Sequence, residues 1–534
     1  MLPNGPVPDP LLGDTDPLLP PAAVLRRHGA RELDPARVQV FPGQQLRPTA
    51  YVGDRLLVRV AELRRNGLDP LAEAARQLGL ELVVGDDQDR FEVQAARTVQ
   101  RMFLRPASDE IPVEPPDAWR VLQRARALGN GNRNADAVAG VGLDHLLFAA
   151  VGVIGSPFSS PHPFSSPHPF SSPHPVGEGA AISQYAVPGW GGRQPVRWMG
   201  PRPVRTERAV RPVVAVLDTG CGTHPWLTGD PNVAGSRGVV TRDGHDPDGG
   251  VAARIGLPAQ PDPEDTGDLT GPLDGIIDAV SGHGTFICGL VHQICPDADL
   301  LSIRVIHSDG IAVESDLIGA LEGVLELVER HAQGEGGRRV DVVSLSLGYY
   351  HEQAADADFD LVMLPVLQRL ADHGVVVVAA AGNDATRRPM LPAAFTPHPG
   401  GLVSEAEHDR PPVIGVGGLN PDGSVALFSN GGPWVRHWEP GAALVSTIPP
   451  TFRGAANPAV ASTDPSGALR QSLDPDDFRA GFAVWSGTSF AAPLLAGRLA
   501  QALIVADGQI EGASASAVDR AWHAVEQTTQ FRRP

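Results

Sequence analysis

The sequence predicts an α/β protein with a doubly wound, mostly parallel sheet, preceded by a smaller α+β domain. Short runs rich in valine, leucine and alanine have the composition of strands that are buried on both faces. These runs alternate with amphipathic helical stretches, the order expected of βαβ units. A chain of 534 residues is long enough for two or three domains. The strand-like runs are 213–217, 300–305, 340–345 and 375–381, and Leu317, Leu321, Val324, Leu325 and Val328 form a helical stripe.

Changes in composition divide the chain into four segments. The first is rich in proline, glycine and aspartate without sustained periodicity, so we expect it to be largely irregular. The third contains three copies of a Ser-Ser-Pro-His-Pro repeat, and its alternating prolines favour a stiff polyproline II spacer. The predicted segments are an irregular stretch at 1–45, a small α+β domain at 46–151, a linker at 152–210 and the main α/β domain at 211–534.

The repeat also carries three regularly spaced histidines, His162, His168 and His174. A spacing of six residues is two turns of polyproline II, so these side chains share a face but lie roughly 19 Å apart. A stiff segment cannot bring them to one metal ion. We therefore interpret the repeat as a spacer between domains.

The small domain has a recognisable order of elements. A strand at 56–60 precedes a helix that begins at Asp69-Pro70, a cap followed by a first-turn proline. A strand at 80–84, another within 91–104, a helix around Val121 and a strand at 145–151 follow. This βαββαβ order is that of ferredoxin-like domains.

A Gly-Thr-Ser run in the main domain points to nucleophilic catalysis. Ser489 lies where this run enters an apolar helical stretch, and a helix N-terminus favours developing negative charge. A serine needs a base, and the base needs an orienting group. The chain supplies Asp218 at the end of a predicted strand and His283 between two glycines at the start of a predicted helix. Asn383 follows another predicted strand and could donate its amide to an oxyanion.

These residues occur in the order Asp, His, Ser, which is the order of subtilisin. From about 211 to 506 the chain resembles the subtilisin-like serine proteases, or subtilases, of peptidase family S8. The resemblance is highly specific because it covers all the main motifs of that family. The matching motifs are Val216-Leu217-Asp218-Thr219-Gly220, Gly282-His283-Gly284-Thr285, Ala379-Ala380-Ala381-Gly382-Asn383 and Ser486-Gly487-Thr488-Ser489 with Ala491-Ala492-Pro493.

The resemblance implies a role for each of these sites. It implies a catalytic triad of Asp218, His283 and Ser489, with Asn383 in the oxyanion hole. It also implies that a peptide substrate adds a β-strand to an exposed edge. The residues that it assigns to substrate binding are Ser346, Leu347, Gly348, Ala380, Ala381 and Gly382.

The chain departs from the family pattern in two informative places. Tyr349 replaces a glycine that is usual beside the S1 pocket, which leaves the substrate preference open. The spacer from Asp218 to His283 is long for the family, and we expect it to form a loop near the cleft. Propeptides of the family have a ferredoxin-like fold, so the resemblance also suggests that the domain at 46–151 inhibits the peptidase domain intramolecularly. An unrelated accessory domain is the alternative.

We therefore predict a serine endopeptidase that hydrolyses peptide bonds through an acyl-enzyme. A narrower alternative is a dedicated intracellular processing protease for one partner. The alternative from another class is an inactive peptide-binding scaffold, which the complete triad disfavours. The expected partner is a polypeptide substrate.

Composition excludes several other classes of function. The net charge of −19 and the pI near 5.3 disfavour binding to nucleic acid or to anionic membranes. The N-terminus has neither a basic start nor an apolar core region, so no signal peptide or membrane span is predicted and we expect a cytoplasmic protein. Cys221, Cys288 and Cys295 lack the spacing of a zinc site and are predicted to be buried free thiols.

No cofactor is predicted, and calcium, which many subtilases bind, stays open as an alternative that no motif supports. Asp243, Asp246 and Asp248 do not match the spacing of a calcium-binding EF-hand loop, and we interpret their segment as a solvated acidic loop.

Overall fold

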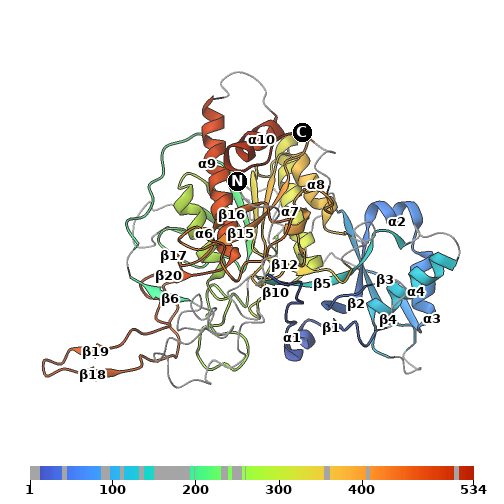
Figure 1. The fold of residues 1–534 in the computed structure, drawn as a ribbon, viewed down its shortest axis with the longest axis horizontal. Helices are drawn as coiled ribbons and strands as arrows, with labels where there is room; N and C mark the ends of the chain where they lie inside the picture. The colour runs from blue at the N-terminus through green and yellow to red at the C-terminus, as the bar shows by residue number, and fades with distance from the viewer. Residues whose placement is uncertain are drawn as a thin grey trace, which may run out of the picture.

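A computed structural model provides the structure of the chain (Figure 1). The repeat at 159–175 and Asp243, Asp246 and Asp248 lie outside the described residues. The interpretations of these two segments therefore stay predictions. The described residues are 12–38, 45–85, 97–108, 114–131, 138–149, 193–197, 199–229, 238–242, 255–258, 260–353, 361–403, 409–509 and 516–534.

A seven-stranded sheet forms the centre of the main domain, with the order β16-β15-β13-β11-β7-β9-β8. Every pairing in it is parallel, which confirms the predicted sheet type. The chain reverses its direction of travel across the sheet between β7 and β11, the position where open α/β sheets hold their sites. The strands are β7 Val213–Asp218, β8 Val240–Arg242, β9 Asp299–Arg304, β11 Val342–Leu345, β13 Val376–Ala380, β15 Val413–Leu419 and β16 His437–Pro440.

Helices cover both faces of this sheet, and successive residues of β7 show how. Ala215 and Leu217 belong to the core beneath α7 and α8, whereas Val214 and Val216 belong to the core beneath α6, α9 and α10. A strand with both faces buried needs apolar side chains at every position, which explains the continuous valine-rich run. The helices are α6 His283–Ile294, α7 Glu314–Gln333, α8 Leu364–Asp372, α9 Thr488–Gln509 and α10 Ala517–Thr528.

Helix α9 crosses the centre of the molecule in Figure 1. Its stretch Thr488–Val505 has the length and hydropathy to cross a membrane, contrary to the sequence-based expectation, but 78% of the stretch is buried inside the protein. A central core helix is apolar for the same reason as a membrane helix, because both lack contact with water.

Smaller elements complete the main domain. Strands β17 Leu444–Thr447, β20 Phe482–Trp485 and β6 Gln194–Val196 form an antiparallel sheet. A hairpin of β18 Ala461–Thr463 and β19 Leu469–Gln471 projects from the body of the protein (Figure 1). A 3-10 helix, η4, spans Ala393–Phe395. The three cysteines are free and buried, as predicted.

The N-terminal part has its own core and an antiparallel sheet with the order β5-β2-β4-β3. Its elements follow the order β2, α3, β3, β4, α4, β5, with one helix, α2, that sequence reasoning missed. A short helix and a strand also interrupt the segment that we expected to be irregular. Their bounds are α1 Ala22–Arg27, β1 Ala30–Leu33, β2 Thr49–Arg59, α2 Val60–Asn66, α3 Asp69–Gln77, β3 Leu80–Val84, β4 Val99–Pro106, α4 Ala118–Gly131 and β5 Val141–Ala149.

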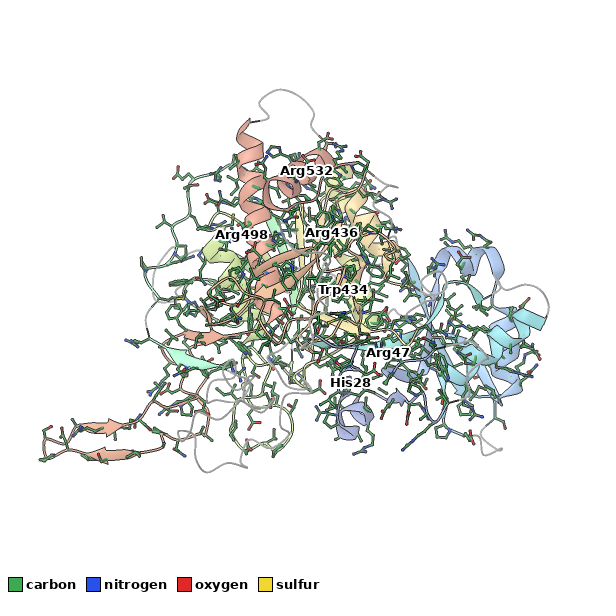
Figure 2. All side chains as sticks on the ribbon, viewed as in Figure 1. His28, Arg47, Trp434, Arg436, Arg498 and Arg532 are labelled. Atoms are coloured by element: carbon green, nitrogen blue, oxygen red, sulfur yellow. The ribbon has the colours of Figure 1, made fainter. Side chains whose placement is uncertain are left out.

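The N-terminal segment lies against the main domain, in the region where Figure 2 labels His28 and Arg47. His28 Nε2 lies 2.9 Å from the Asp309 carboxylate in the loop after β9. Arg388 of the main domain pairs with Asp16 at 2.9 Å, and Arg47 pairs with the same carboxylate at 2.7 Å. These tertiary contacts account for order in a segment whose local sequence specifies little structure.

Strand β5 continues out of the N-terminal domain and joins the two domains. It pairs antiparallel with β10 (Ile311–Val313) and with β12 (Leu347–Tyr350), and β12 in turn pairs with β14 (Met390–Leu391). One sheet of eight strands therefore spans both domains.

Buried polar contacts connect the same two surfaces. The Glu322 carboxylate on α7 accepts hydrogen bonds from the Thr98 backbone N–H, from the Thr98 hydroxyl at 2.7 Å and from the Val99 N–H at 3.2 Å. The Asp144 carboxylate on β5 accepts from the Ser315 N–H and hydroxyl, each at 2.9 Å. Ser315 lies in the first turn of α7, where backbone N–H groups have no partner within the helix.

We expect Glu322→Ala to weaken this junction, because three buried donors would lose their acceptor. Leaving buried donors unsatisfied costs about 1–3 kcal/mol. Thermal and denaturant unfolding of the variant and of the wild type measures the loss. The exposed Glu335→Ala is the matched control and should change stability by less than about 0.5 kcal/mol. Equal stability of the two variants would contradict the assignment.

Candidate active site

Asp218 and His283 lie in direct contact. Asp218 is the last residue of β7, and His283 is the first residue of α6. Nδ1 of His283 lies 2.7 Å from Asp218 Oδ1, and both side chains are buried. A carboxylate at Nδ1 fixes the tautomer with the proton on that nitrogen, so Nε2 is left as the basic atom. The structure therefore brings together two of the predicted catalytic residues.

A close approach of two backbones holds this pair. A Cβ atom at Gly284 would lie 2.0 Å from the carbonyl oxygen of Gly220, in the turn after Asp218. The Gly284 N–H donates to the Thr219 hydroxyl at 2.8 Å. Only glycine permits this contact, which explains why a glycine follows the histidine.

Ser489 and Asn383 meet at the start of α9. The Asn383 side-chain oxygen accepts hydrogen bonds from the Thr488 N–H at 2.9 Å and from the Thr488 hydroxyl at 2.8 Å. Because the amide is planar, its NH₂ group faces away from Thr488. The Ser346 hydroxyl donates to the Ser489 carbonyl oxygen at 2.8 Å, which joins the end of β11 to the same helix start.

The two pairs of residues are neighbours. The His283 ring lies 5.2 Å from the ring of Phe490, the residue after Ser489, and 5.6 Å from that of Trp485. His283 Nε2 is buried and makes no hydrogen bond within the described part of the chain. The bond from Ser489 to His283 that general-base catalysis needs is thus not formed in this structure. Such bonds are often long in the absence of substrate and tighten when it binds.

The predicted substrate-binding residues divide into two sets. Leu347 and Gly348 belong to β12 and pair with Ala149 and Phe148 of β5. Ala380 and Ala381 have their backbones engaged by β15, through the pairing of Ala380 with Val416 and the hydrogen bond from the Ala381 N–H to the Val416 carbonyl oxygen. The Gly382 N–H donates to the Thr488 hydroxyl at 3.0 Å.

Sequence reasoning missed Glu264, which connects the Asp218 turn to the His283 helix. Its carboxylate accepts hydrogen bonds from the hydroxyls of Thr219 and Thr285 and from the Gly284 N–H at 3.1 Å. Burial raises the pKa of Glu264 to about 8, against the lowering effect of the two threonine hydroxyls. It lies in the acidic segment that we interpreted as solvated, and only the length of the spacer hinted at a role.

Sequence reasoning also missed the structural role of Arg193. Its guanidinium donates to the carbonyl oxygens of Ser281 and Asp278, and to that of Ile277 at 3.2 Å. The same group lies 4.8 Å from the centre of the Trp485 ring. Arg193 thereby ties the loop before His283 to the strand before Ser489.

One group of described side chains has the residue types of a metal site. The ligand atoms of His145, His351 and Glu352 lie within 4.8 Å of one another. However, His145 Nδ1 lies 2.7 Å from the Glu314 carboxylate, and Nε2 lies 2.9 Å from that of Glu352. These contacts already satisfy the ring as an ion pair, so we assign no metal there. The expectation that the chain needs no cofactor stays a prediction.

Glu264 gives a pH-dependent prediction. Its pKa rises from an ordinary value of 4.5 to about 8 on folding, so the folded chain holds the proton more tightly. The free energy of unfolding should therefore fall as the pH rises from about 4.5 to about 8. Glu264→Gln should remove this part of the slope in pH-dependent unfolding of Ser489→Ala protein. The exposed Asp265→Asn is the control and should keep the slope; an unchanged slope in Glu264→Gln would refute the assignment.

Comparisons with known proteins identify related proteases. Subtilisin-like protease PopC of Myxococcus xanthus (strain DK1622) is 29% identical over 226 residues, which cover 40% of this chain and 40% of PopC. An intracellular serine protease of Paenibacillus polymyxa is 26% identical over 308 residues, 56% of this chain and 68% of that protein. The chain thus spans about two fifths of the length of PopC.

Among solved structures, fervidolysin from Fervidobacterium pennivorans, described as a keratinolytic enzyme related to subtilisin, is 15% identical with a TM-score of 0.43. The match covers 88% of this chain and 56% of fervidolysin. The model of the subtilase family matches residues 211–523, more than half of the chain. The match spans every motif from the Asp218 block to the Ser489 block, and the chain belongs to the subtilase family.

Proposed function

We propose that this chain is a serine endopeptidase that hydrolyses polypeptides through an acyl-enzyme. The observation that carries the proposal is the 2.7 Å contact between Asp218 and Nδ1 of His283, which leaves Nε2 as a base. Ser489 at the N-terminus of α9 supplies the nucleophile, and membership of the family supports both roles. Each step below follows from this arrangement.

In the first half-reaction, Ser489 Oγ attacks the peptide carbonyl carbon while its proton moves to His283 Nε2. Asp218 stabilises the resulting imidazolium. The Asn383 amide and the Ser489 backbone N–H hold the negative oxygen of the tetrahedral intermediate. The C–N bond then breaks, and the proton on Nε2 passes to the leaving amine. In the second half-reaction, water repeats these steps against the acyl-enzyme and restores the Ser489 hydroxyl.

We also propose that the N-terminal domain inhibits the peptidase intramolecularly. Strand β5 occupies the edge of β12 at Leu347 and Gly348, which are predicted to pair with substrate. The Ala149 N–H donates to the Gly310 carbonyl oxygen at 2.9 Å, so β5 uses backbone groups on both sides of the same groove. A peptide and β5 cannot make these hydrogen bonds at the same time.

A buried ion cluster supports this inhibitory contact. His145 of β5 lies between Glu314 and Glu352 of the peptidase domain and is buried with them. Burial lowers the pKa of His145, but the two carboxylates raise it to about 10, so the ring is an imidazolium at neutral pH. Removing one partner from a buried ion pair leaves an uncompensated charge, which is strongly destabilising.

The narrower role of a dedicated processing protease is consistent with this inhibition. An intramolecular inhibitor limits activity to the time and place at which it is released. The relative from Paenibacillus polymyxa is described as an intracellular serine protease. Because of this similarity, we propose that the present chain is also located in the cytoplasm.

Labelling with a serine-directed fluorophosphonate tests the proposed function. Wild-type protein should become labelled and Ser489→Ala should not. Intact mass recorded over time should show loss of an N-terminal fragment from the wild type alone. If the wild type is not labelled even after an added protease has removed the N-terminal domain, the chain is instead a peptide-binding scaffold.

His145→Ala tests the inhibitory contact in the full chain. Loss of the imidazolium leaves the buried carboxylates of Glu314 and Glu352 without the cation that lies between them, so the domains should separate more often and the initial rate of labelling should rise several-fold. The initial rate is measured on uncut protein, with His331→Ala on the exposed part of α7 as the control. A variant that unfolds at lower temperature but labels at the wild-type rate would show that the contact is structural only.

A further inference from the structure

The position of Met390 bears on which peptides the active site accepts, an inference that rests on the proposed function. A substrate that pairs with β12 as β5 does must bring its scissile carbonyl to Ser489 and Asn383. The Ser346–Ser489 contact and the Gly382–Thr488 hydrogen bond place these groups beside both β12 and Gly382. The side chain before the scissile bond, called P1, therefore enters between Gly348 and Gly382.

Met390 fills the space between these two glycines. A Cβ atom at Gly382 would lie 2.4 Å from Met390 Sδ, and one at Gly348 would lie 2.7 Å from Met390 Cε. Met390 belongs to β14, where it pairs with Tyr350 of β12, and it is only 2% exposed. The thioether thus lies against both walls of the site, and each wall lacks a side chain where the thioether packs.

A hydrogen-bonded floor prevents Met390 from moving deeper. The Tyr350 hydroxyl donates to Asp384 Oδ2 at 2.6 Å, and the Asn430 amide donates to the Tyr350 oxygen at 2.6 Å and to the Ala381 carbonyl oxygen at 2.8 Å. Asn430 Nδ2 also lies 4.0 Å from Met390 Sδ. Closely packed interiors yield little to an extra side chain, so a large P1 residue would have to displace buried, mutually bonded groups.

We propose that this peptidase cleaves after residues with small side chains, namely alanine, glycine or serine, and that Met390 determines this specificity. The carboxylate of Asp384 accepts from Tyr350, so the floor is not arranged to bind a basic P1 side chain. The segment of this chain that lies on β12 is consistent with the proposal. It ends with Ala149, and the next residue in the sequence is also alanine.

The test compares kcat/KM for fluorogenic peptides that differ only at P1, alanine against phenylalanine. Wild-type protein should favour alanine, and Met390→Ala should shift the ratio toward phenylalanine by at least about 10-fold, the scale at which pocket size discriminates. The volume-conserving Met390→Leu should keep the wild-type preference. Met363→Ala, which removes a fully buried methionine from another part of the core, should keep it as well.

Fluorophosphonate titration fixes the concentration of active sites for every variant, and the ratio of two substrates does not depend on how much protein is folded. A wild type that favours phenylalanine, or an unchanged ratio in Met390→Ala, overturns the specificity proposal while the proposed function stands. Loss of labelling in the wild type overturns the proposed function itself. If Met390→Ala yields no active sites, Met390→Val takes its place, with a smaller shift expected in the same direction.

Discussion

The backbone edge of β12 is the constraint on which the rest of this structure depends. A strand edge carries N–H and C=O groups that need partners, and β5 supplies them here. That pairing makes one sheet out of two domains and also covers the edge at which we propose that a peptide substrate binds. In that proposal, inhibition and recognition use the same groups. The surrounding contacts, at Glu322 and His145, are polar and buried, and such groups can return to water when the domains separate.

The contact between Asp218 and His283 depends on a second constraint, the distance between a strand end and a helix start. Strand β7 lies between β9 and β11, so its carboxyl end cannot shift without disturbing both neighbours. The contact of Gly284 with Gly220 sets how near α6 comes to that end. The buried carboxylate of Glu264 then hydrogen-bonds to both the turn and the helix. Its pKa is raised because burial disfavours the charged form, so this contact positions the two elements at a cost in stability.

The sequence was sufficient for features that local patterns encode. The run before Asp218 predicts a doubly buried strand, and the glycines around His283 predict a tight helix start. Both lie where expected and in contact. Glu264 could not be predicted, because its partners are at Thr219 and Thr285 and no periodicity marks its segment. The order in the N-terminal segment was missed for a related reason, since β1 exists only through its pairing with β2.

Tyr349 shows how a departure from a family pattern can be explained only in three dimensions. Its replacement of a glycine beside the expected S1 pocket left the substrate preference open. In the structure its hydroxyl donates to Glu314 at 2.9 Å and its ring stacks on His145 at 4.4 Å, so it belongs to the junction with the N-terminal domain. The next residue, Tyr350, supports the floor beneath Met390. Successive residues of one strand point to opposite faces, so β12 directs one tyrosine to the junction with the N-terminal domain and the other to the proposed specificity site.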